Sequence, residues 1–517
     1  MRVVVKDIRI PVTVRDYKGE IKRRLLKLLS GVKIKDFEIK RRSIDARDKK
    51  KMVYWVFSVV ADVEGKVNFD GKVYPYNEFF LPFKKPTKDV FPVIVGAGPS
   101  GLFSALLFTY CGIKGVIVER GCKVEDRVVK VEKLWNEGIL DEDCNCQFGE
   151  GGAGTFSDGK LTTRIKDDFV GFVLREFVKF GAPENILFDS KPHIGTDYVR
   201  LVVRNIREFL LKSGWEIYYG TKVKDIEVNS GRIKAVLAEN LRIEGTHFIF
   251  SIGNSARDTF NMLIKRGIAM TSKPFAIGFR IEHPQAFIDR NQYGKFHIYL
   301  PPASYNLSHH FKEANRGVYT FCMCPGGYII CVSSESGSVV TNGMSYYKRD
   351  SGYANSAIVV TVDKRDYGSD PLGGVEFQRG IERLAFKMSG GYYAISQKAI
   401  DFVKSKETRG DLKTTYRPAT VTGDLSRLFK EDLVAFLRKG LVEFDRRIKG
   451  FVEKGILVGP ETRTSSPIRI LRDEKRLHSV SCENLFPVGE GSGYAGGIMS
   501  SVIDGFKAVI SILGVGE

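Results

Sequence analysis

The chain has 517 residues, of which 43% are hydrophobic, and carries a formal net charge of +19. This length predicts about three domains with well-filled cores, and it excludes a short disulfide-stapled protein, because eight cysteines are too few for such a scaffold. Charges interrupt the first residues, and no apolar run approaches the roughly 18 residues that span a bilayer. We therefore expect a cytoplasmic protein without a membrane span, in which most cysteines are reduced.

The N-terminal segment holds most of the basic excess. Residues 1–90 contain 23 lysines and arginines against 12 acidic residues, a net charge of +11, while the rest of the chain adds +8. We predict an α+β module over residues 1–88, with a strand over 2–14, a helix over 17–30, strands near 36–43 and 52–62, and a linker over 81–89. The apolar face of the helix is assigned to Ile21, Leu25, Leu28 and Leu29. The basic excess has two interpretations: a solvated face, or a surface that binds RNA or another polyanion with salt-dependent affinity.

A glycine-rich turn follows the linker. Residues 91–121 run as a short apolar strand, the sequence Gly-Ala-Gly-Pro-Ser-Gly, an apolar helix and a second strand that ends in Glu119. In this pattern Gly96 permits the tight turn, Gly98 lets the backbone approach a pyrophosphate, and Gly101 lets the helix pack closely on the strand. Pro99 has no N–H to lose at the first helical position, and the carboxylate of Glu119 stands where it accepts a ribose 2′-hydroxyl. The pattern predicts a dinucleotide site for FAD or NAD and not for NADP.

The later chain continues with strands and a second glycine turn. We predict a helix from residue 197, a strand over 215–219, a hairpin around 229–231, a buried strand over 247–253, and mostly strands from 274 to about 362. Residues 484–491 again form a short apolar strand that runs into a glycine turn and a helix. Apart from these two turns, no glycine motif of this type follows a strand, so a separate NAD(P)H domain is not expected.

Seven segments of the sequence are similar to those of one known family. They are residues 43–47, 149–161, 282–285, 322–327, 342–345, 461–467 and 489–505. Nearly end to end, the chain resembles the FAD-dependent dehydrogenase-like (NAD(FAD)-utilising) proteins, within the two-dinucleotide-binding-domain flavoproteins. The resemblance implies an α/β fold in which a Rossmann-type FAD-binding domain is discontinuous, over residues 89–270 and 456–517. It also implies an inserted, mainly antiparallel β substrate domain with helices over 271–455, beside the N-terminal module.

The resemblance further implies which residues hold FAD. The set lies at the two glycine turns, at the end of the second strand, in the glycine-rich loop over 149–161, in a strand after Gly220 and at the end of the buried strand over 247–253. Its members are Gly96, Gly98, Pro99, Ser100, Gly101, Glu119, Arg120, Gly152, Gly154, Lys160, Val223, Gly253, Gly489, Glu490, Gly496, Gly497 and Ile498. Val223, in a strand after Gly220, is expected to meet the adenine. Glu490 stands where related flavoproteins place an aspartate on the ribityl chain or a phosphate.

Two of these groups are expected at the flavin ring. The loop glycines wrap the isoalloxazine with Lys160 near N5 or N1, although a surface turn would use the same Ser-Asp-Gly sequence. The final helix, which Gly496 and Gly497 open, points its N-terminal amides at the ring and stabilises negative charge on the reduced flavin.

Four cysteines form two Cys-x-Cys pairs, Cys144/Cys146 and Cys322/Cys324. Residues i and i+2 of an extended strand lie about 6.6 Å apart, near the upper limit for a disulfide, so a bridge within a pair needs a bent backbone. Three interpretations are open: buried small residues, a zinc site from all four without the usual Cys-x-x-Cys spacing, and a redox role for the second pair. We take Cys322 and Cys324 as the candidate catalytic residues.

The remaining polar candidates are weaker. The seven histidines show no metal-ligand spacing, and we predict no metal site. His283 ends a predicted strand and is the acid/base candidate, or else only closes that strand. Arg463 and Arg469 bind a substrate anion or hold a loop.

The sequence thus predicts an FAD-dependent oxidoreductase of the dehydrogenase type. The flavin exchanges a hydride with an unidentified substrate held between the FAD domain and the antiparallel domain. We expect the redox partner to be a small molecule or a protein. If NADH is the reductant, we expect it to contact the flavin only transiently. Two alternatives stay open: an RNA-binding flavoprotein that resembles tRNA-uridine modifiers and grips RNA with its basic N-terminal module, and a flavin redox sensor without turnover.

Overall fold

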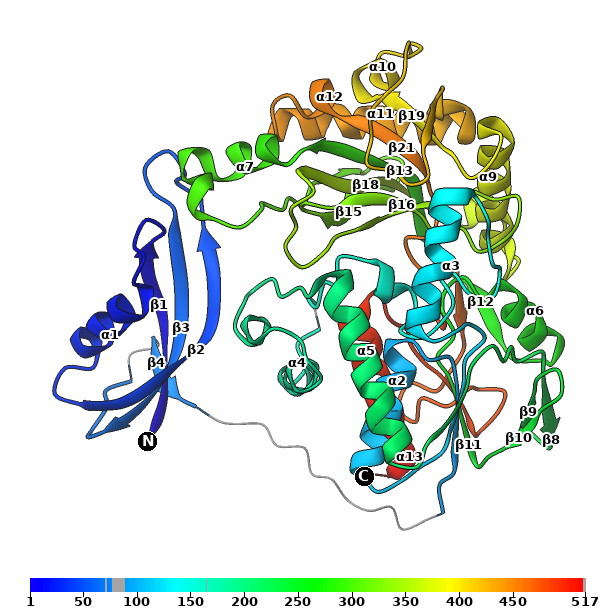
Figure 1. Cartoon of the computed structure of the whole chain (residues 1–517), viewed down its shortest axis with the longest axis horizontal. Helices are drawn as coiled ribbons and strands as arrows, with labels where there is room; N and C mark the ends of the chain where they lie inside the picture. The colour runs from blue at the N-terminus through cyan, green and yellow to red at the C-terminus, as the bar shows by residue number, and fades with distance from the viewer. Residues whose placement is uncertain (70–71, 77–88, 164, 515–517) are drawn as a thin grey trace.

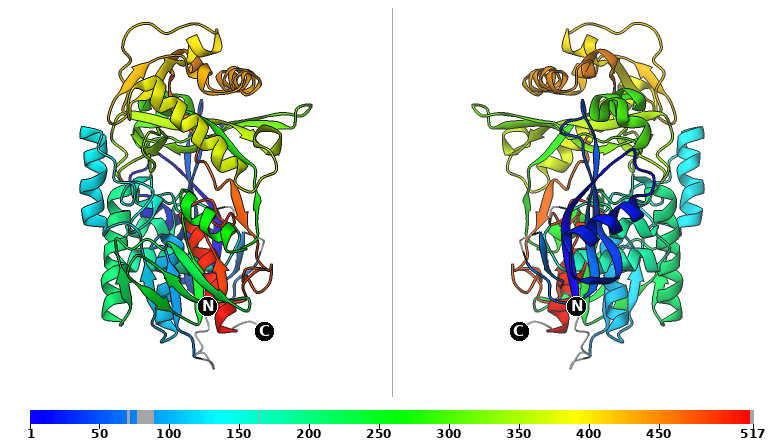
Figure 2. Two further views of the ribbon diagram at one scale, coloured as in Figure 1. Left: turned by 90° about the vertical axis from the view of Figure 1, so that its right-hand side faces the viewer. Right: turned by 90° about the vertical axis from the view of Figure 1, so that its left-hand side faces the viewer.

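Three large β-sheets, of four, five and seven strands, organise the chain (Figure 1). The structure is a computed structural model that describes residues 1–69, 72–76, 89–163 and 165–514. The predicted linker over 81–89 lies outside the described residues, except for its last position. Figure 2 shows the seven-stranded sheet with its helices stacked over the five-stranded sheet with its own.

The four-stranded sheet forms the predicted N-terminal module. Its strands lie antiparallel in the order β2-β3-β1-β4, with one helix, α1, packed on the sheet. The bounds are β1 Arg2–Pro11, α1 Tyr17–Leu28, β2 Lys33–Asp45, β3 Tyr54–Glu64 and β4 Val73–Pro75. Ile21, Leu25 and Leu29 are buried as predicted, but Leu28 is 50% exposed. The prediction for Leu28 is wrong because Leu25 and Leu29, one turn apart, already form the buried stripe.

Among the described residues, the N-terminal module contacts the remainder of the molecule through Arg42 and through a small apolar cluster. Arg42, near the end of β2, exchanges backbone hydrogen bonds with residues 188–190 and forms a bidentate ion pair with Asp189 at 2.8 and 3.1 Å. Val12 and Val53 pack against Phe296 in a small buried cluster.

The five-stranded sheet is fully parallel, in the order β23-β11-β5-β6-β7. Its strands are β5 Pro92–Val95, β6 Val116–Val118, β7 Glu216–Tyr218, β11 His247–Phe250 and β23 Leu485–Pro487. The last strand arrives from the C-terminal end of the chain, so two separate segments of the sequence build this sheet. Strand residues such as Ile94, Ile117 and Ile249 are fully buried, which a parallel sheet with both faces covered requires.

Helices and a small sheet cover the five-stranded sheet. Helix α2 packs against α13 and α5 on one face, while a β-meander of β8, β9 and β10 and helix α6 lie beyond the other (Figure 1). The bounds are α2 Pro99–Tyr110, α3 Val124–Glu137, α4 Phe169–Lys179, α5 Gly195–Lys212, β8 Asp225–Asn229, β9 Arg232–Leu237, β10 Arg242–Glu244, α6 Arg257–Lys265 and α13 Ile498–Leu513. The hairpin predicted around 229–231 joins β8 to β9.

The seven-stranded sheet has the order β14-β15-β18-β13-β21-β19-β20, antiparallel except for the β19–β20 pair. Its strands are β13 Phe275–Pro284, β14 Ser308–Phe311, β15 Arg316–Cys324, β18 Tyr353–Val362, β19 Ala394–Lys398, β20 Thr420–Thr422 and β21 Ile456–Glu461. The predicted boundaries put residues 456–461 with the C-terminal segment, whereas β21 pairs with β13 and β19 in this sheet. The domain boundaries otherwise stay predictions.

Helices and a short hairpin complete the layer that is built on the seven-stranded sheet. These elements are α7 Gln285–Tyr293, α8 Lys364–Tyr367, α9 Gly373–Ser389, α10 Ala399–Val403, α11 Glu431–Arg447 and α12 Phe451–Lys454, with the hairpin of β16 Tyr328–Cys331 and β17 Thr341–Met344. A separate strand pair, β12 Met270–Ser272 and β22 Ile468–Ile470, joins distant segments of the chain and packs with the core of the parallel sheet. Among the described residues, no helix is both long enough and apolar enough to cross a membrane.

Candidate functional site

A cavity of about 400 Å³ lies between the parallel sheet and the seven-stranded sheet. One wall comes from the carboxyl ends of parallel strands, at Val95, Val118 and Ser251, where ligands bind in open α/β sheets. The opposite wall includes Phe321 and Cys322 of β15. The cavity therefore connects the glycine turn to the antiparallel sheet.

Most of the predicted cofactor residues line this cavity. They are Gly96, Gly98, Pro99, Ser100, Glu119, Arg120, Gly152, Gly154, Lys160, Val223, Gly253, Glu490, Gly496, Gly497 and Ile498. Gly101 and Gly489 are not part of the lining, and of the two candidate cysteines only Cys322 is. Segments separated by hundreds of residues thus meet around one space.

The first glycine turn has the steric character that the sequence predicts. Gly96 has a φ of +103°, and a Cβ there would come within 2.7 Å of the Ser251 carbonyl oxygen. A Cβ on Gly101 would collide with the Gly96 carbonyl oxygen, so Gly101 serves packing inside the protein. Gly98 caps α2, which begins at Pro99, and the nearest atom to a Cβ at Gly98 is 3.8 Å away. The helix N-terminus faces the cavity without a side-chain cap, which suits an anion.

Glu119 is buried at the end of β6. Its carboxylate accepts three backbone hydrogen bonds, from the N–H groups of Ala97 at 2.7 Å, Gly121 at 2.9 Å and Gly149 at 3.0 Å. A carboxylate has about four acceptor sites, so one remains for a ligand hydroxyl in the cavity. Glu119 therefore both ties the glycine turn to the loop at 149 and keeps the capacity to hold a ribose.

The neighbours of Glu119 shape the same end of the cavity. The Arg120 guanidinium pairs with Asp258 at 2.8 Å and lies 4.2 Å from the centre of the Phe148 ring. Val223 also lines the cavity, but residues 219–224 lie outside any strand. The predicted strand at Val223 is wrong, because the chain leaves the sheet after β7 and pairs again only from Asp225 onward, in the β-meander.

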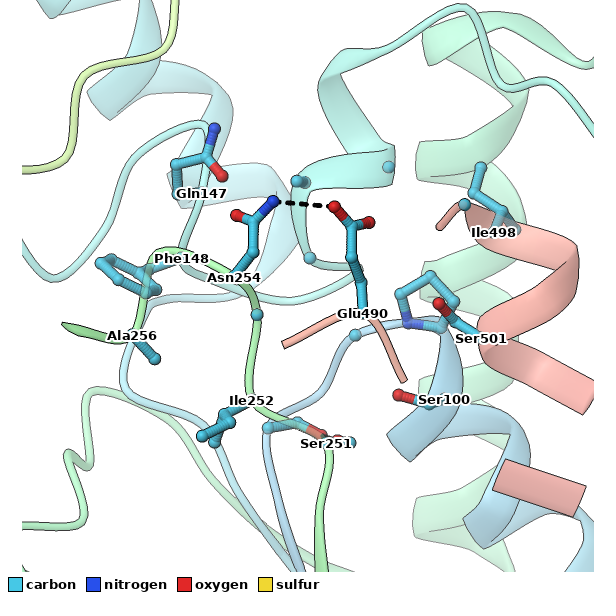
Figure 3. Close-up of a pocket in the computed structure, with 18 of the residues that line it drawn as sticks. Ser100, Gln147, Phe148, Ser251, Ile252, Asn254, Ala256, Glu490, Ile498 and Ser501 are labelled. Carbon is cyan, nitrogen blue, oxygen red and sulfur yellow. Dashed lines mark hydrogen bonds between the residues drawn. The ribbon is translucent and has the colours of Figure 1, made fainter. Parts of the chain in front are cut away.

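Glu490 and Asn254 meet inside the cavity (Figure 3). The Asn254 side-chain N–H donates to the Glu490 carboxylate at 2.7 Å. Burial raises the pKa of Glu490 to about 7, against the lowering effect of this hydrogen bond. Asn254 was missed in the sequence, although its place directly after the glycine that ends a parallel strand was a usable signal.

Lys160, Cys322 and Cys324 lie together at the antiparallel side. The Lys160 ammonium is 3.0 Å from the Asp158 carboxylate and 3.8 Å from the Cys324 Sγ atom. Burial alone would lower the pKa of Lys160, but the Asp158 carboxylate outweighs it and raises that pKa. The residue facing the cavity here is therefore a lysine that stays positively charged.

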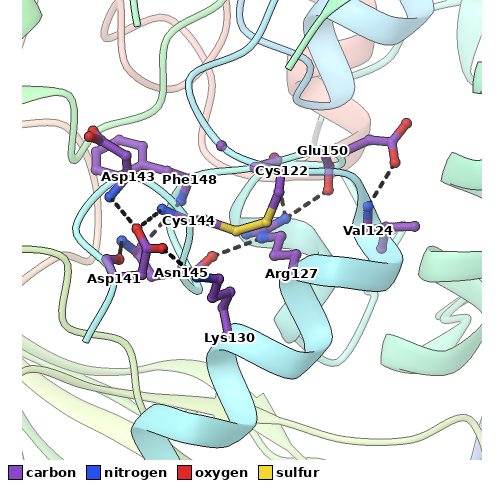
Figure 4. The surroundings of a disulfide bond; sticks show 12 residues. Cys122, Val124, Arg127, Lys130, Asp141, Asp143, Cys144, Asn145, Phe148 and Glu150 are labelled. Atoms are coloured by element: carbon purple, nitrogen blue, oxygen red, sulfur yellow. Dashed lines mark hydrogen bonds and ion pairs between the residues drawn. A yellow bond between two sulfur atoms is a disulfide. The ribbon is translucent and has the colours of Figure 1, made fainter. Parts of the chain in front are cut away.

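A disulfide joins Cys122 to Cys144, with 5.8 Å between their Cα atoms (Figure 4). Cys144 and Cys146 form a Cys-x-Cys pair in the sequence, where a bridge within the pair would need a bent backbone. Cys144 is instead bonded to Cys122, which follows β6 by a few residues, while the Cys146 thiol donates to the Cys331 carbonyl oxygen. Six cysteines are free. Neither half of the disulfide lines the cavity.

The other polar candidates divide between core and cavity. His283 is 1% exposed, donates a hydrogen bond from Nε2 to the Phe451 carbonyl oxygen at 2.7 Å, and is not in the cavity lining. Burial lowers the pKa of His283 to about 4, which suits a neutral core residue. Arg463 does line the cavity, but its guanidinium is paired with the buried Glu382 at 2.7 Å. Among the described residues, no cluster of His, Cys, Asp and Glu is arranged for a metal ion.

Sequence comparison with known proteins identifies the family. The family model described as FAD-dependent protein, C-terminal domain-like, matches residues 274–464. An uncharacterised protein of Clostridium beijerinckii is 42% identical over 500 residues, which cover 94% of this chain and 93% of that relative. The chain belongs to this FAD-dependent protein family. The resemblance that the seven sequence segments predicted is confirmed.

Two solved enzyme structures show a weak likeness to this chain. Glycerol-3-phosphate dehydrogenase from Bacillus halodurans, complexed with FAD, is 12% identical with a TM-score of 0.36, over 84% of this chain and 66% of the dehydrogenase. L-Amino acid deaminase from Proteus vulgaris is 11% identical with a TM-score of 0.31, over 85% of this chain and 96% of the deaminase. Likeness at this level carries no argument about activity.

Proposed function

We propose that this protein is an FAD-dependent oxidoreductase whose cofactor occupies the cavity between the two sheets. One observation carries the proposal: three features border the same cavity. They are the N-terminus of α2, which no side chain caps, the buried carboxylate of Glu119 at the end of β6, and a wall that comes from a second sheet. A dinucleotide needs the first two features, and a redox substrate needs a second wall beside the flavin.

The residues present fit FAD. The N-terminal amides of α2 would hold the pyrophosphate, and Glu119 would accept a ribose hydroxyl with its remaining acceptor site. FAD, when bound, supplies a two-electron redox centre. The charged Lys160 and the N-terminus of α13, which begins at Ile498, would stabilise negative charge on the reduced ring. The nearly neutral pKa of Glu490 lets its carboxyl group accept or donate a hydrogen bond to the cofactor.

The first experiment is the visible spectrum of the purified protein under anaerobic conditions, before and after NADH and then dithionite. We expect a flavin peak at about 450 nm. Bleaching by NADH identifies a nicotinamide reductant, whereas bleaching by dithionite alone points to a substrate or protein donor. A protein that shows no flavin peak even after incubation with FAD contradicts the proposal.

The same preparation separates an enzyme from a redox sensor. An oxidoreductase turns over one defined substrate many times faster than its reduced flavin reacts with air. A protein whose flavin reoxidises rapidly, with no preference among acceptors, fits the sensor.

A further inference from the structure

Cys322 and Cys324 lie where strand β15 leaves the regular sheet. Between Phe321 and Cys324 the strand holds one more residue than the facing stretch of β18, from Ala357 to Asn355, which is a β-bulge. Cys322 at this bulge has a φ of +44°, in the left-handed region that only a few per cent of residues other than glycine adopt. The bulge supplies the bent backbone that a bridge between positions i and i+2 requires.

The bend also separates the environments of the two thiols. Cys322 lines the cavity and is partly exposed, whereas Cys324 is fully buried behind it. The Cys324 thiol donates to the Cys322 carbonyl oxygen at 3.3 Å. Cys322 therefore borders the ligand space, and Cys324 lies buried two residues further along the strand.

Positive charge surrounds the pair. The Arg280 guanidinium donates to the Cys322 carbonyl oxygen at 2.6 Å and lies 3.9 Å from the Cys324 Sγ atom, and Lys160 approaches the same sulfur at 3.8 Å. The facing acids are already paired, Asp158 with Lys160 at 3.0 Å and Glu461 with Arg280 at 2.7 Å.

These contacts favour one thiolate. The contact between the two side chains, in which Cys324 keeps its proton, and the charges of Lys160 and Arg280 lower the pKa of Cys322, while the same contact and burial raise the pKa of Cys324. A thiolate paired with a thiol is the resting form of reactive dithiols.

We propose that Cys322 and Cys324 form a dithiol/disulfide couple that exchanges two electrons with the flavin, a second redox centre in the same cavity. This inference rests on the proposed function, because the flavin is its electron donor or acceptor. In one direction, the Cys322–Cys324 bond breaks, and the two sulfurs take up two electrons from the reduced flavin and two protons. In the other, the S–S bond forms, and the two electrons and two protons leave to the oxidised flavin.

The other cysteines do not share this environment. Burial raises the pKa of the thiols of Cys111, Cys146, Cys331 and Cys482, and none of these residues lines the cavity. Cys111, buried at the end of α2, is therefore a matched control for substitution.

The test follows the two thiols in the wild-type, FAD-loaded protein. The air-oxidised protein and the protein photoreduced anaerobically with EDTA are each denatured in a first alkylating reagent, then reduced and labelled with a heavy one. Fragment masses report each cysteine separately. We expect Cys322 and Cys324 to carry the heavy label in the oxidised protein and the light label after photoreduction. Protein stripped of FAD should show no change on illumination, because the electrons come from the flavin.

A reductive titration independently counts the electrons that the protein takes up per FAD. In a Cys122→Ser/Cys144→Ser background, which removes the other disulfide, we expect about four electrons per FAD, two for the flavin and two for the couple. Cys322→Ser should lower this to two, and Cys111→Ser should leave it at four.

The outcomes separate this inference from the proposed function. If the flavin is bound and photoreduced but the labelling of Cys322 and Cys324 does not change, the dithiol couple is overturned and the oxidoreductase stands. If no FAD binds, both are overturned.

Discussion

Gly98 and Gly101 occupy one turn but meet different steric demands. We expect Gly98→Glu to fold and to lose FAD, because its Cβ has ordinary space while its carboxylate enters the cavity where the pyrophosphate would lie. Gly101→Ala should instead lower the free energy of unfolding by about 1–3 kcal/mol, because its Cβ collides with the Gly96 carbonyl oxygen. Absorbance of the purified variants and chemical denaturation distinguish the two effects. A yellow, fully loaded Gly98→Glu protein would contradict the site.

Glu282 predicts a pH dependence of stability. It is 1% exposed on β13 and accepts hydrogen bonds from the Thr415 backbone N–H at 3.1 and 3.2 Å. Burial raises the pKa of Glu282 from 4.5 to about 7, so the folded protein binds a proton more tightly than the unfolded chain. The contribution of the protonated Glu282 to the free energy of unfolding is complete below pH 4.5. It is lost as the pH rises to about 7, a change on the order of 2–3 kcal/mol.

Glu282→Gln should remove this slope because the amide does not titrate. Denaturation of wild type and variant at pH 5, 6, 7 and 8 measures the difference, with the exposed Glu313→Gln as control. Equal pH profiles for wild type and Glu282→Gln would show that Glu282 titrates normally.

A buried ion network joins elements of both sheets. Glu382 of α9 pairs with Arg257 of α6 at 2.8 Å and with Arg463, beyond β21, at 2.7 Å. Burial disfavours the carboxylate, yet the two guanidinium groups hold the pKa of Glu382 well below its usual range. The network therefore stabilises the junction between the parallel sheet and the antiparallel layer only while all three partners remain.

Glu382→Gln should destabilise the protein by about 3–5 kcal/mol, because it removes the carboxylate that two buried guanidinium groups share and leaves Arg257 with only its pair to Glu335 at 2.7 Å. Glu376→Gln, on the exposed side of the same helix, should cost less than about 1 kcal/mol. Its side chain is 60% exposed. Urea denaturation measures the free energy of unfolding of both variants. If Glu382→Gln lowers it no more than Glu376→Gln does, the network does not stabilise the protein.

At the scale of the whole molecule, the Arg42–Asp189 pair anchors the N-terminal module. Both side chains are about four-fifths buried, with exposed fractions of 22% and 21%. Asp189→Ala should weaken this anchor by about 1 kcal/mol and speed amide hydrogen exchange near Arg42 about fivefold. Asp62→Ala, at an exposed position of the same module, is the control. Unchanged exchange around residue 42 would mean that the backbone pairing to residues 188–190 is sufficient.

The charge of the N-terminal module predicts how RNA binding would behave. If the +11 of residues 1–90 grips RNA, affinity should fall at least about tenfold between 50 and 200 mM salt. Lys50→Glu/Lys51→Glu should weaken binding, while Lys439→Glu/Lys449→Glu, outside the module, should not. If the intact protein shows no salt-sensitive binding of RNA, the basic residues form only a solvated face.

Local pattern was enough for part of the fold and site. The glycine turn, the helix that begins at Pro99 and the carboxylate of Glu119 follow each other within 30 residues, so steric rules for a strand-turn-helix unit predict them. The bond between Cys144 and Cys122 and the hydrogen bond between Asn254 and Glu490 could not be predicted in this way. Each depends on a neighbour that sequence distance does not reveal.

The sequence by itself determined that the chain carries a glycine turn between a strand and a helix, a second strand-and-turn near its C-terminal end and a basic first segment. These are properties of local backbone sterics and of summed charge. Only the tertiary structure decided that β15, with Cys322 at a bulge, faces the glycine turn across one cavity, and that Glu382 lies between two arginines. Strand order and side-chain packing make those choices, since burial and charge pairing act between residues that are distant along the chain.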